Sequence, residues 1–199
     1  MFPFFETMAM KEGSIRNVFF HQKRMEETFK MFYPSEKAIN LSLIQFQEPM
    51  LPHLKYKVKV QYNNLGFKFN VQPYHSKVFK NVHIKNDNQI DYPFKFTNRK
   101  NINSLMKQIP DTDQIIILKD DYITDSSYSN IVFYDGERWI TPATPLLKGT
   151  MREYLLSEKR INEDYLEVKQ LIHFKEFKFI NAMNNLDEAH SYPMSCILY

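Results

Sequence analysis

The sequence predicts an α+β fold built as two lobes, and three features of the chain support this prediction. Apolar residues between positions 15 and 32 recur at the spacing of an amphipathic helix, which Pro34 ends. Residues 56–74 alternate apolar and polar side chains on both sides of a turn at 63–66, as in a β-hairpin. Further strands and helices then mix without a regular repeat, which favours α+β lobes over a doubly wound sheet.

The boundary between the lobes is expected in the polar stretch 77–88. Residues 1–84 then form a small N-terminal lobe and residues 89–199 a larger C-terminal lobe. In the larger lobe we expect a helix over 98–109, a buried strand over 115–118 and a hairpin at Asp135-Gly136, since Asp-Gly readily adopts positive φ. A further helix opens at Thr150, which has capping-box spacing to Glu153.

Composition excludes several classes of function. The 26 basic and 23 acidic residues nearly balance, so no nucleic-acid partner is expected. Only four glycines are present, and they form neither a GxGxxG nor a Walker A loop. The six histidines lack metal-ligand spacing, so no metal is expected. The single cysteine, Cys196, the lack of a long apolar run and the lack of a basic leader predict a cytoplasmic protein without membrane contact.

Four residues could carry chemistry, although each also has an ordinary structural interpretation. Lys95 lies between aromatic residues and could form a Schiff base, or could be an exposed lysine on the wet side of a strand. Arg24 shares a helical face with His21 and could simply be solvated. Thr150 opens a helix whose amides could bind phosphate or only be capped. Asp125 could be a functional acid or could cap a turn.

Taken in order, these residues lie in fragments that resemble the class IV aminotransferases, which are the fold-type IV pyridoxal-phosphate enzymes. The resemblance covers nearly the whole chain. The fragments that carry it are Phe5-Glu6-Thr7, His21-Gln22-Lys23-Arg24-Met25, Lys95-Phe96-Thr97-Asn98-Arg99, Ile123-Thr124-Asp125-Ser126-Ser127-Tyr128-Ser129-Asn130-Ile131, Thr141-Pro142, Leu146-Leu147-Lys148-Gly149-Thr150-Met151-Arg152 and Asn181-Ala182-Met183.

The resemblance implies a fold like that of D-amino-acid aminotransferase, with pyridoxal 5'-phosphate in the cleft between the lobes and a homodimer completing the site. Lys95 would hold the cofactor as a Schiff base and would then move a proton at the substrate α-carbon. Arg24 and the backbone amides of Thr150 and Met151 would bind the cofactor phosphate. Asp125 would pair with the pyridine nitrogen and keep it protonated, so that the ring can accept electrons.

The sequence departs from the family pattern at three places that bear on the substrate. Asp125 stands where glutamate is usual and is one methylene shorter. Lys59 stands where many relatives have an arginine, so it offers a point charge in place of a bidentate fork. The R-G-x-x-Y-G-D-G-type run that relatives carry does not precede Phe5. Thr7, Lys59 and Asn181 are the residues expected on the substrate side.

The favoured reaction is that of 4-amino-4-deoxychorismate lyase, which releases pyruvate and forms 4-aminobenzoate for folate biosynthesis. The reason is that Lys95-x-x-Asn98-Arg99 and the compact length are similar to the lyase branch of the family. An amino-acid aminotransferase of the branched-chain or D-amino-acid type is the alternative, since it uses the same lysine and the same first proton abstraction. In both cases the partner is a small amino substrate. A non-catalytic scaffold on the same fold is the third possibility.

Overall fold

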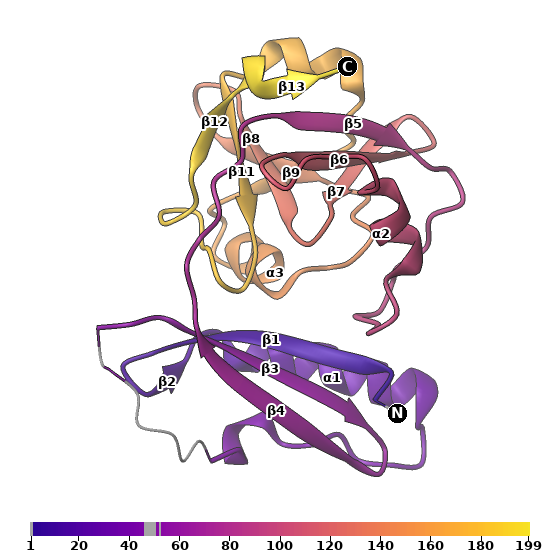
Figure 1. Ribbon diagram of the computed structural model, residues 1–199, viewed down its shortest axis with the longest axis vertical. Helices are drawn as coiled ribbons and strands as arrows, with labels where there is room; N and C mark the ends of the chain where they lie inside the picture. The colour runs from indigo at the N-terminus through magenta and orange to yellow at the C-terminus, as the bar shows by residue number, and fades with distance from the viewer. Residues whose placement is uncertain (1, 46–50, 52) are drawn as a thin grey trace. The chain divides into compact units, whose positions relative to one another are not determined.

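The computed structural model describes residues 2–45, 51 and 53–199. Two compact units make up the chain (Figure 1): the first comprises Met1–Ser76 and Phe94–Asn98, and the second comprises Lys77–Pro93 and Arg99–Tyr199. This division differs from the boundary expected between residues 84 and 89. Residues 82–86 pair with a strand of the second unit, whereas Phe96 bridges to Phe4 and so places Lys95 in the first unit.

The first unit is an antiparallel sheet in the order β2-β1-β3-β4, and helix α1 packs on one of its faces (Figure 1). Side chains alternate along β3 between buried and half-buried, so Val58 and Val60 meet Met25 and Phe29 of α1 in the core. The elements of this unit are β1 (Phe4–Lys11), β2 (Ser14–Ile15), α1 (Val18–Phe32), η1 (Leu41–Leu43), β3 (Tyr56–Asn63) and β4 (Gly66–Pro73).

The structure confirms the helix and the hairpin predicted for this part of the chain. The helix ends at Phe32, before Pro34, but it begins at Val18 because Ile15 lies in strand β2. The hairpin consists of β3 and β4, which pair along their whole lengths.

The second unit contains two sheets that share one core. Their strand orders are β13-β5-β6-β7 and β10-β9-β8-β11-β12. Val82 and Ile116 of the first sheet belong to the same buried cluster as Phe133 and Phe177 of the second. The elements are β5 (Val82–Asn86), α2 (Lys100–Leu105), β6 (Gln114–Lys119), β7 (Tyr122–Ser126), β8 (Asn130–Tyr134), β9 (Trp139–Pro142), α3 (Thr150–Ser157), β10 (Asn162–Asp164), η2 (Val168–His173), β11 (Glu176–Ile180), β12 (Ser191–Pro193), η3 (Met194–Cys196) and β13 (Ile197–Leu198).

The buried strand and the hairpin predicted in this unit are confirmed as β6 and as β8 with β9, whereas three local predictions need correction. The supposed linker 77–88 contains strand β5, which pairs in parallel with β6. The helix expected over 98–109 covers only Lys100–Leu105. The capping box is wrong: Gly149 is the N-cap and gives no side-chain cap, while Thr150 is already helical and the Glu153 carboxylate binds Arg152 instead.

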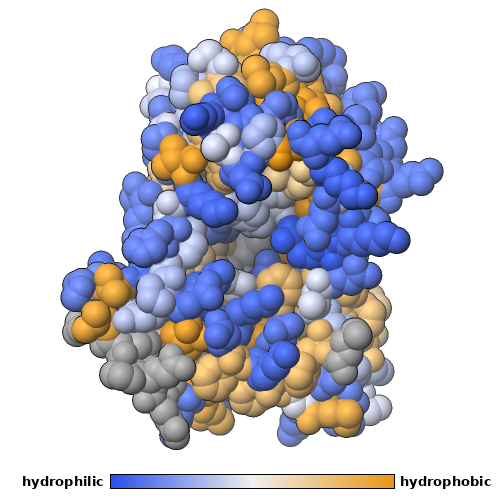
Figure 2. Space-filling model, viewed as in Figure 1, coloured by the Kyte–Doolittle hydropathy of each residue, from blue (hydrophilic) through white to orange (hydrophobic). Residues whose placement is uncertain are grey.

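The surface carries both hydrophilic and hydrophobic side chains on the face that Figure 2 shows. Two large hydrophobic side chains, Phe67 and Phe69, lie on β4 at the edge of its sheet, and each is 40% exposed. Within the described residues, no helix has the length and apolar character that crossing a membrane requires.

Candidate functional site

Lys95 lies in an extended segment that continues the sheet of the first unit beyond β1. The backbone oxygen of Lys95 accepts a hydrogen bond from the amide of Phe5 at 3.1 Å, and Phe96 bridges to Phe4. Phe94 and Phe96 pack against the core, whereas the Lys95 Nζ lies 4.9 Å from the centroid of the Phe5 ring. The aromatic residues at 94 and 96 and the lysine between them therefore face opposite ways, as the sequence predicts.

A second lysine lies against the same ring of Phe5. The Lys59 Nζ is 4.8 Å from the Phe5 centroid, and Lys59 is the register partner of Thr7 across strands β1 and β3. Lys68 makes a similar contact with Phe2, at 5.7 Å from the ring centroid. This face of the sheet, opposite to α1, thus combines aromatic rings with ammonium groups and suits a ligand that carries negative charge.

On the α1 face of the same sheet lies a buried charged cluster formed by Glu6, His21 and Arg24. The Glu6 carboxylate is fully buried and accepts hydrogen bonds from Arg24 Nε at 2.9 Å and Arg24 Nη2 at 2.5 Å. His21 Nδ1 lies 2.6 Å from Glu6 Oε2, the same oxygen that Arg24 Nη2 contacts. The Glu6 carboxylate therefore holds the guanidinium of Arg24 in one orientation.

The pKa values in this cluster follow from burial and from the cluster's own charges. Burial alone would raise the pKa of Glu6, but Arg24 and His21 outweigh it and bring that pKa down to about 2. Burial lowers the pKa of His21, although the hydrogen bond that His21 donates to Glu6 and the charge of Glu6 oppose this. At neutral pH the cluster consequently holds an ionised Glu6, an ionised Arg24 and a neutral His21, whose Nδ1–H donates to Glu6.

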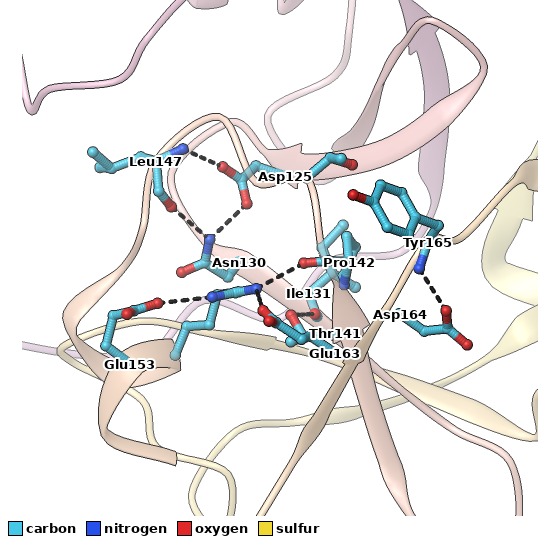
Figure 3. Close-up of polar contacts among 12 residues, drawn as sticks. Asp125, Asn130, Ile131, Thr141, Pro142, Leu147, Glu153, Glu163, Asp164 and Tyr165 are labelled. Atoms are coloured by element: carbon cyan, nitrogen blue, oxygen red, sulfur yellow. Dashed lines mark hydrogen bonds and ion pairs between the residues drawn. The ribbon is translucent and has the colours of Figure 1, made fainter. Parts of the chain in front are cut away.

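Asp125 of β7, labelled in Figure 3, belongs to the second unit. It is a buried carboxylate, only 5% exposed. Its Oδ1 accepts a hydrogen bond from Asn130 Nδ2 at 2.6 Å, and its Oδ2 accepts one from the Leu147 amide at 2.9 Å. Burial raises the pKa of Asp125 to about 6 despite these two donors and the charge of Arg152. Both donors are neutral amides. These two hydrogen bonds therefore hold the carboxylate in place without neutralising its negative charge.

The N-terminus of α3 follows directly after the loop that contacts Asp125. Gly149 is its N-cap residue, with φ of −70° and ψ of 140°, and the first helical residues Thr150 and Met151 are both buried. A helix N-terminus presents backbone N–H groups and a positive partial charge, which is the arrangement that binds phosphate.

Arg152 is a buried residue of this region whose structural role was not predicted from the sequence. Its side chain is 2% exposed and donates from Nη2 to the Pro142 carbonyl at 3.0 Å and to Glu163 at 2.6 Å. Its Nη1 donates to Glu153 at 2.7 Å (Figure 3 draws these contacts). Arg152 thereby fixes α3 against β9 and β10.

Of the three residues expected on the substrate side, Thr7 and Lys59 are adjacent, whereas Asn181 belongs to the other unit. The Asn181 Nδ2 donates to Ser129 Oγ at 2.8 Å, and its Oδ1 accepts from the amides of Met183 and Asn184. Both ends of this amide thus take part in hydrogen bonds within the second unit.

Comparison with known proteins identifies the family of this chain. The family model for class IV aminotransferases matches residues 3–191. The chain belongs to the class IV aminotransferase family. Members of this family depend on pyridoxal phosphate and act as aminotransferases or lyases, and the mixed α+β architecture is that of fold type IV.

Individual relatives agree with the family match. An uncharacterized protein of Haemophilus influenzae is 36% identical over 189 residues, which are 94% of this chain and 100% of that protein. A crystal structure from Haemophilus somnus 129PT, provisionally named a 4-amino-4-deoxychorismate lyase, is 32% identical with a TM-score of 0.86 and covers 94% of this chain and 98% of its own.

A third comparison concerns the fold alone. The structure of a protein from Thermotoga maritima, provisionally named a branched-chain amino acid aminotransferase, has a TM-score of 0.70 at 17% identity. The match covers 98% of this chain and 76% of that protein.

Two residues of the candidate site, Glu6 and Asn130, had no role predicted from the sequence. Glu6 could have been found, because the alternation along β1 places it on the core side between Phe4 and Met8, where a carboxylate needs a buried cation. No comparable pattern in the sequence marks Asn130.

Proposed function

We propose that this class IV aminotransferase is a pyridoxal-phosphate enzyme in which Lys95 binds the cofactor aldehyde. The observation that carries the proposal is Asp125, a buried carboxylate held only by neutral donors in its two hydrogen bonds. Such a group suits a protonated pyridine nitrogen, because a cationic partner would compensate the cost of burying its charge. The cofactor, when bound, supplies a ring that accepts electrons from the substrate.

The same proposal gives roles to the other residues that the family resemblance implies. Arg24, oriented by Glu6, and the amides of Thr150 and Met151 at the start of α3 would bind the phosphate. Asp125 would hold the proton on the pyridine nitrogen. The Lys95 amine would remove a proton from the substrate carbon that bears the amino group.

The reaction we favour is the conversion of 4-amino-4-deoxychorismate into 4-aminobenzoate and pyruvate, a step toward folate. One support is the provisional lyase name of the Haemophilus somnus protein, which is 32% identical over nearly the whole chain. The other is the face that carries Phe5, Lys59 and Thr7, since a substrate with two carboxylates and a ring suits ammonium groups beside an aromatic side chain. Lys59 and Thr7 would contact a substrate carboxylate.

An amino-acid aminotransferase is the second candidate. The family includes aminotransferases, and the same Lys95 and Asp125 would serve amino transfer equally well. The two candidates differ in whether the substrate loses a leaving group or gives its amino group to a 2-oxo acid.

Two further features belong to the same proposal. We expect a homodimer, and the half-exposed Phe67 and Phe69 on the edge strand β4 are suitable contact residues. We also expect the enzyme to work in the cytoplasm, where its single cysteine, Cys196, stays reduced.

Visible absorption during titration with pyridoxal phosphate tests the cofactor assignment. Wild type and the control Lys57→Ala, which removes a lysine of β3, should bind the cofactor and form an absorbance that borohydride removes. After borohydride, mass spectrometry should find the cofactor attached at Lys95, and Lys95→Ala should show neither signal. If wild type and Lys95→Ala gave the same absorbance and the same mass spectrum, the assignment of Lys95 would be wrong and the non-catalytic scaffold would be the preferred interpretation.

Product assays then separate the two enzymes. Pyruvate and 4-aminobenzoate formed in equal amounts from aminodeoxychorismate would support the lyase. Amino transfer to 2-oxo acids without pyruvate release would support the aminotransferase and contradict our preference.

A further inference from the structure

We propose that Asn130 is a positioning residue that fixes the carboxylate of Asp125 relative to Gly149, the N-cap residue of α3. In this way one side chain would set the spacing between the groups that receive the pyridine nitrogen and the phosphate. This inference rests on the proposed function, because it gives both groups to the same cofactor.

A closed set of three hydrogen bonds joins Asp125, Asn130 and Leu147 (Figure 3). Asn130 Nδ2 donates to Asp125 Oδ1 at 2.6 Å and to the Leu147 carbonyl at 3.0 Å. The Leu147 amide donates to Asp125 Oδ2 at 2.9 Å. Since each of the three residues contacts the other two, neither the carboxylate nor the loop can shift without breaking a hydrogen bond.

The opposite end of the Asn130 amide faces Gly149. A Cβ added at Gly149 would overlap Asn130 Oδ1. The backbone of Gly149 has φ of −70°, which any residue adopts, so the requirement for glycine here comes from space and not from backbone conformation. Asn130 therefore contacts both Asp125 and the residue that begins the helix.

The chemistry of an amide suits this position. Asn130 donates a hydrogen bond without bringing a positive charge, so Asp125 stays available to a cationic nitrogen. Lysine or arginine at 130 would form an ion pair with Asp125 and would compete with that nitrogen. The neighbouring Ser129 accepts a hydrogen bond from Asn181, which holds the residue that precedes β8.

Two variants separate the hydrogen bonds of Asn130 from its volume. Asn130→Ala removes both, whereas Asn130→Asp keeps the shape but replaces the donor by a like charge beside Asp125. We expect each to weaken pyridoxal-phosphate binding by about 10- to 100-fold, since a hydrogen bond to a charged group is lost. The control Asn162→Ala, at an exposed position on β10, should leave the dissociation constant unchanged.

A readout without cofactor distinguishes positioning from general support of the fold. Asn130 lowers the pKa of Asp125 by its hydrogen bond, so both variants should raise that pKa in the cofactor-free protein, as followed by carbon-13 NMR of the Asp125 carboxyl. If Asn130 only supported the fold, the variants would have a lower melting temperature, but the pKa of Asp125 would not change.

A double-mutant cycle with Gly149→Ala tests the second contact. Gly149→Ala should weaken cofactor binding in wild type, but it should add little when Asn130 is already alanine, because the space is then open. Additive effects, or binding by Asn130→Ala within threefold of wild type, would overturn the proposal while leaving the cofactor assignment intact. If wild type itself binds no pyridoxal phosphate, both this inference and the proposed function are wrong.

Discussion

Replacing Asp125 by asparagine should favour the folded, cofactor-free protein more at pH 7.5 than at pH 4.5, although it should abolish cofactor function. Burial raises the pKa of this carboxyl from 3.8 to about 6, so the folded state holds a proton that the unfolded state releases between these values. Stability therefore falls as pH rises through this window, because the unfolded chain binds fewer protons. At about 1.4 kcal/mol for each pKa unit, the cost of the ionised group reaches about 3 kcal/mol at pH 7.5 but only about 1 kcal/mol at pH 4.5.

Asparagine is uncharged at both pH values, but its NH2 group replaces one of the two oxygens that accept hydrogen bonds, at a cost that does not change with pH. The effect of Asp125→Asn on the free energy of unfolding should therefore be about 2 kcal/mol more favourable at pH 7.5 than at pH 4.5. Urea unfolding of the cofactor-free protein measures this free energy at both pH values. The matched control is Asp135→Asn, because amide hydrogen bonds from Glu137 and Arg138 lower the pKa of Asp135. That variant should lose a similar amount of stability at pH 7.5 and at pH 4.5, because both values lie above the ordinary aspartate pKa of 3.8 and the stabilisation is lost only below it. An effect of Asp125→Asn on the free energy of unfolding that is the same at both pH values would refute the reasoning.

Two further predictions concern the first unit. Glu6→Gln leaves the buried charge of Arg24 without its carboxylate partner, so it should lower the free energy of unfolding at pH 7 by about 3–5 kcal/mol. The control Glu12→Gln, at an exposed position, should change the free energy of unfolding by less than about 1 kcal/mol. A similar loss in both variants would contradict the prediction. Lys59→Met removes an ammonium group that would contact a substrate carboxylate, so it should raise KM for a dicarboxylate substrate by about 10- to 100-fold with a smaller effect on kcat. The control Lys57→Met, on the same strand and face, should leave KM unchanged. Steady-state kinetics would reject the role of Lys59 if both variants matched wild type.

Periodicity predicted the elements whose burial follows from their own sequence. The alternation in residues 56–74 specified a hairpin, because a one-residue slip would move Val58 and Val60 out of the core. The apolar run at 115–118 specified a strand buried on both faces. Conversely, the polar residues around Val82 concealed strand β5, which forms because it pairs with the distant strand β6.

The order of its motifs was enough to assign the chain to the class IV aminotransferases and to nominate Lys95, Arg24, Asp125 and Thr150. The environments of these residues depended on contacts between segments far apart in the sequence. Glu6 lies 18 residues from Arg24, and Leu147 lies 22 residues from Asp125. Local spacing cannot show such pairs, nor the burial that shifts their pKa values.

The sequence by itself thus determined the family, the three α-helices, the strands β3, β4, β6, β8 and β9, and the residue types of the candidate site. Only the tertiary structure decided that Lys95 lies beside β1, that Gly149 and not Thr150 caps α3, and that Asn130 fills the space next to Gly149. The physical reason is that residue type and periodicity act over a few neighbouring positions, whereas desolvation, steric fit and buried hydrogen bonds depend on which distant segments the fold brings together.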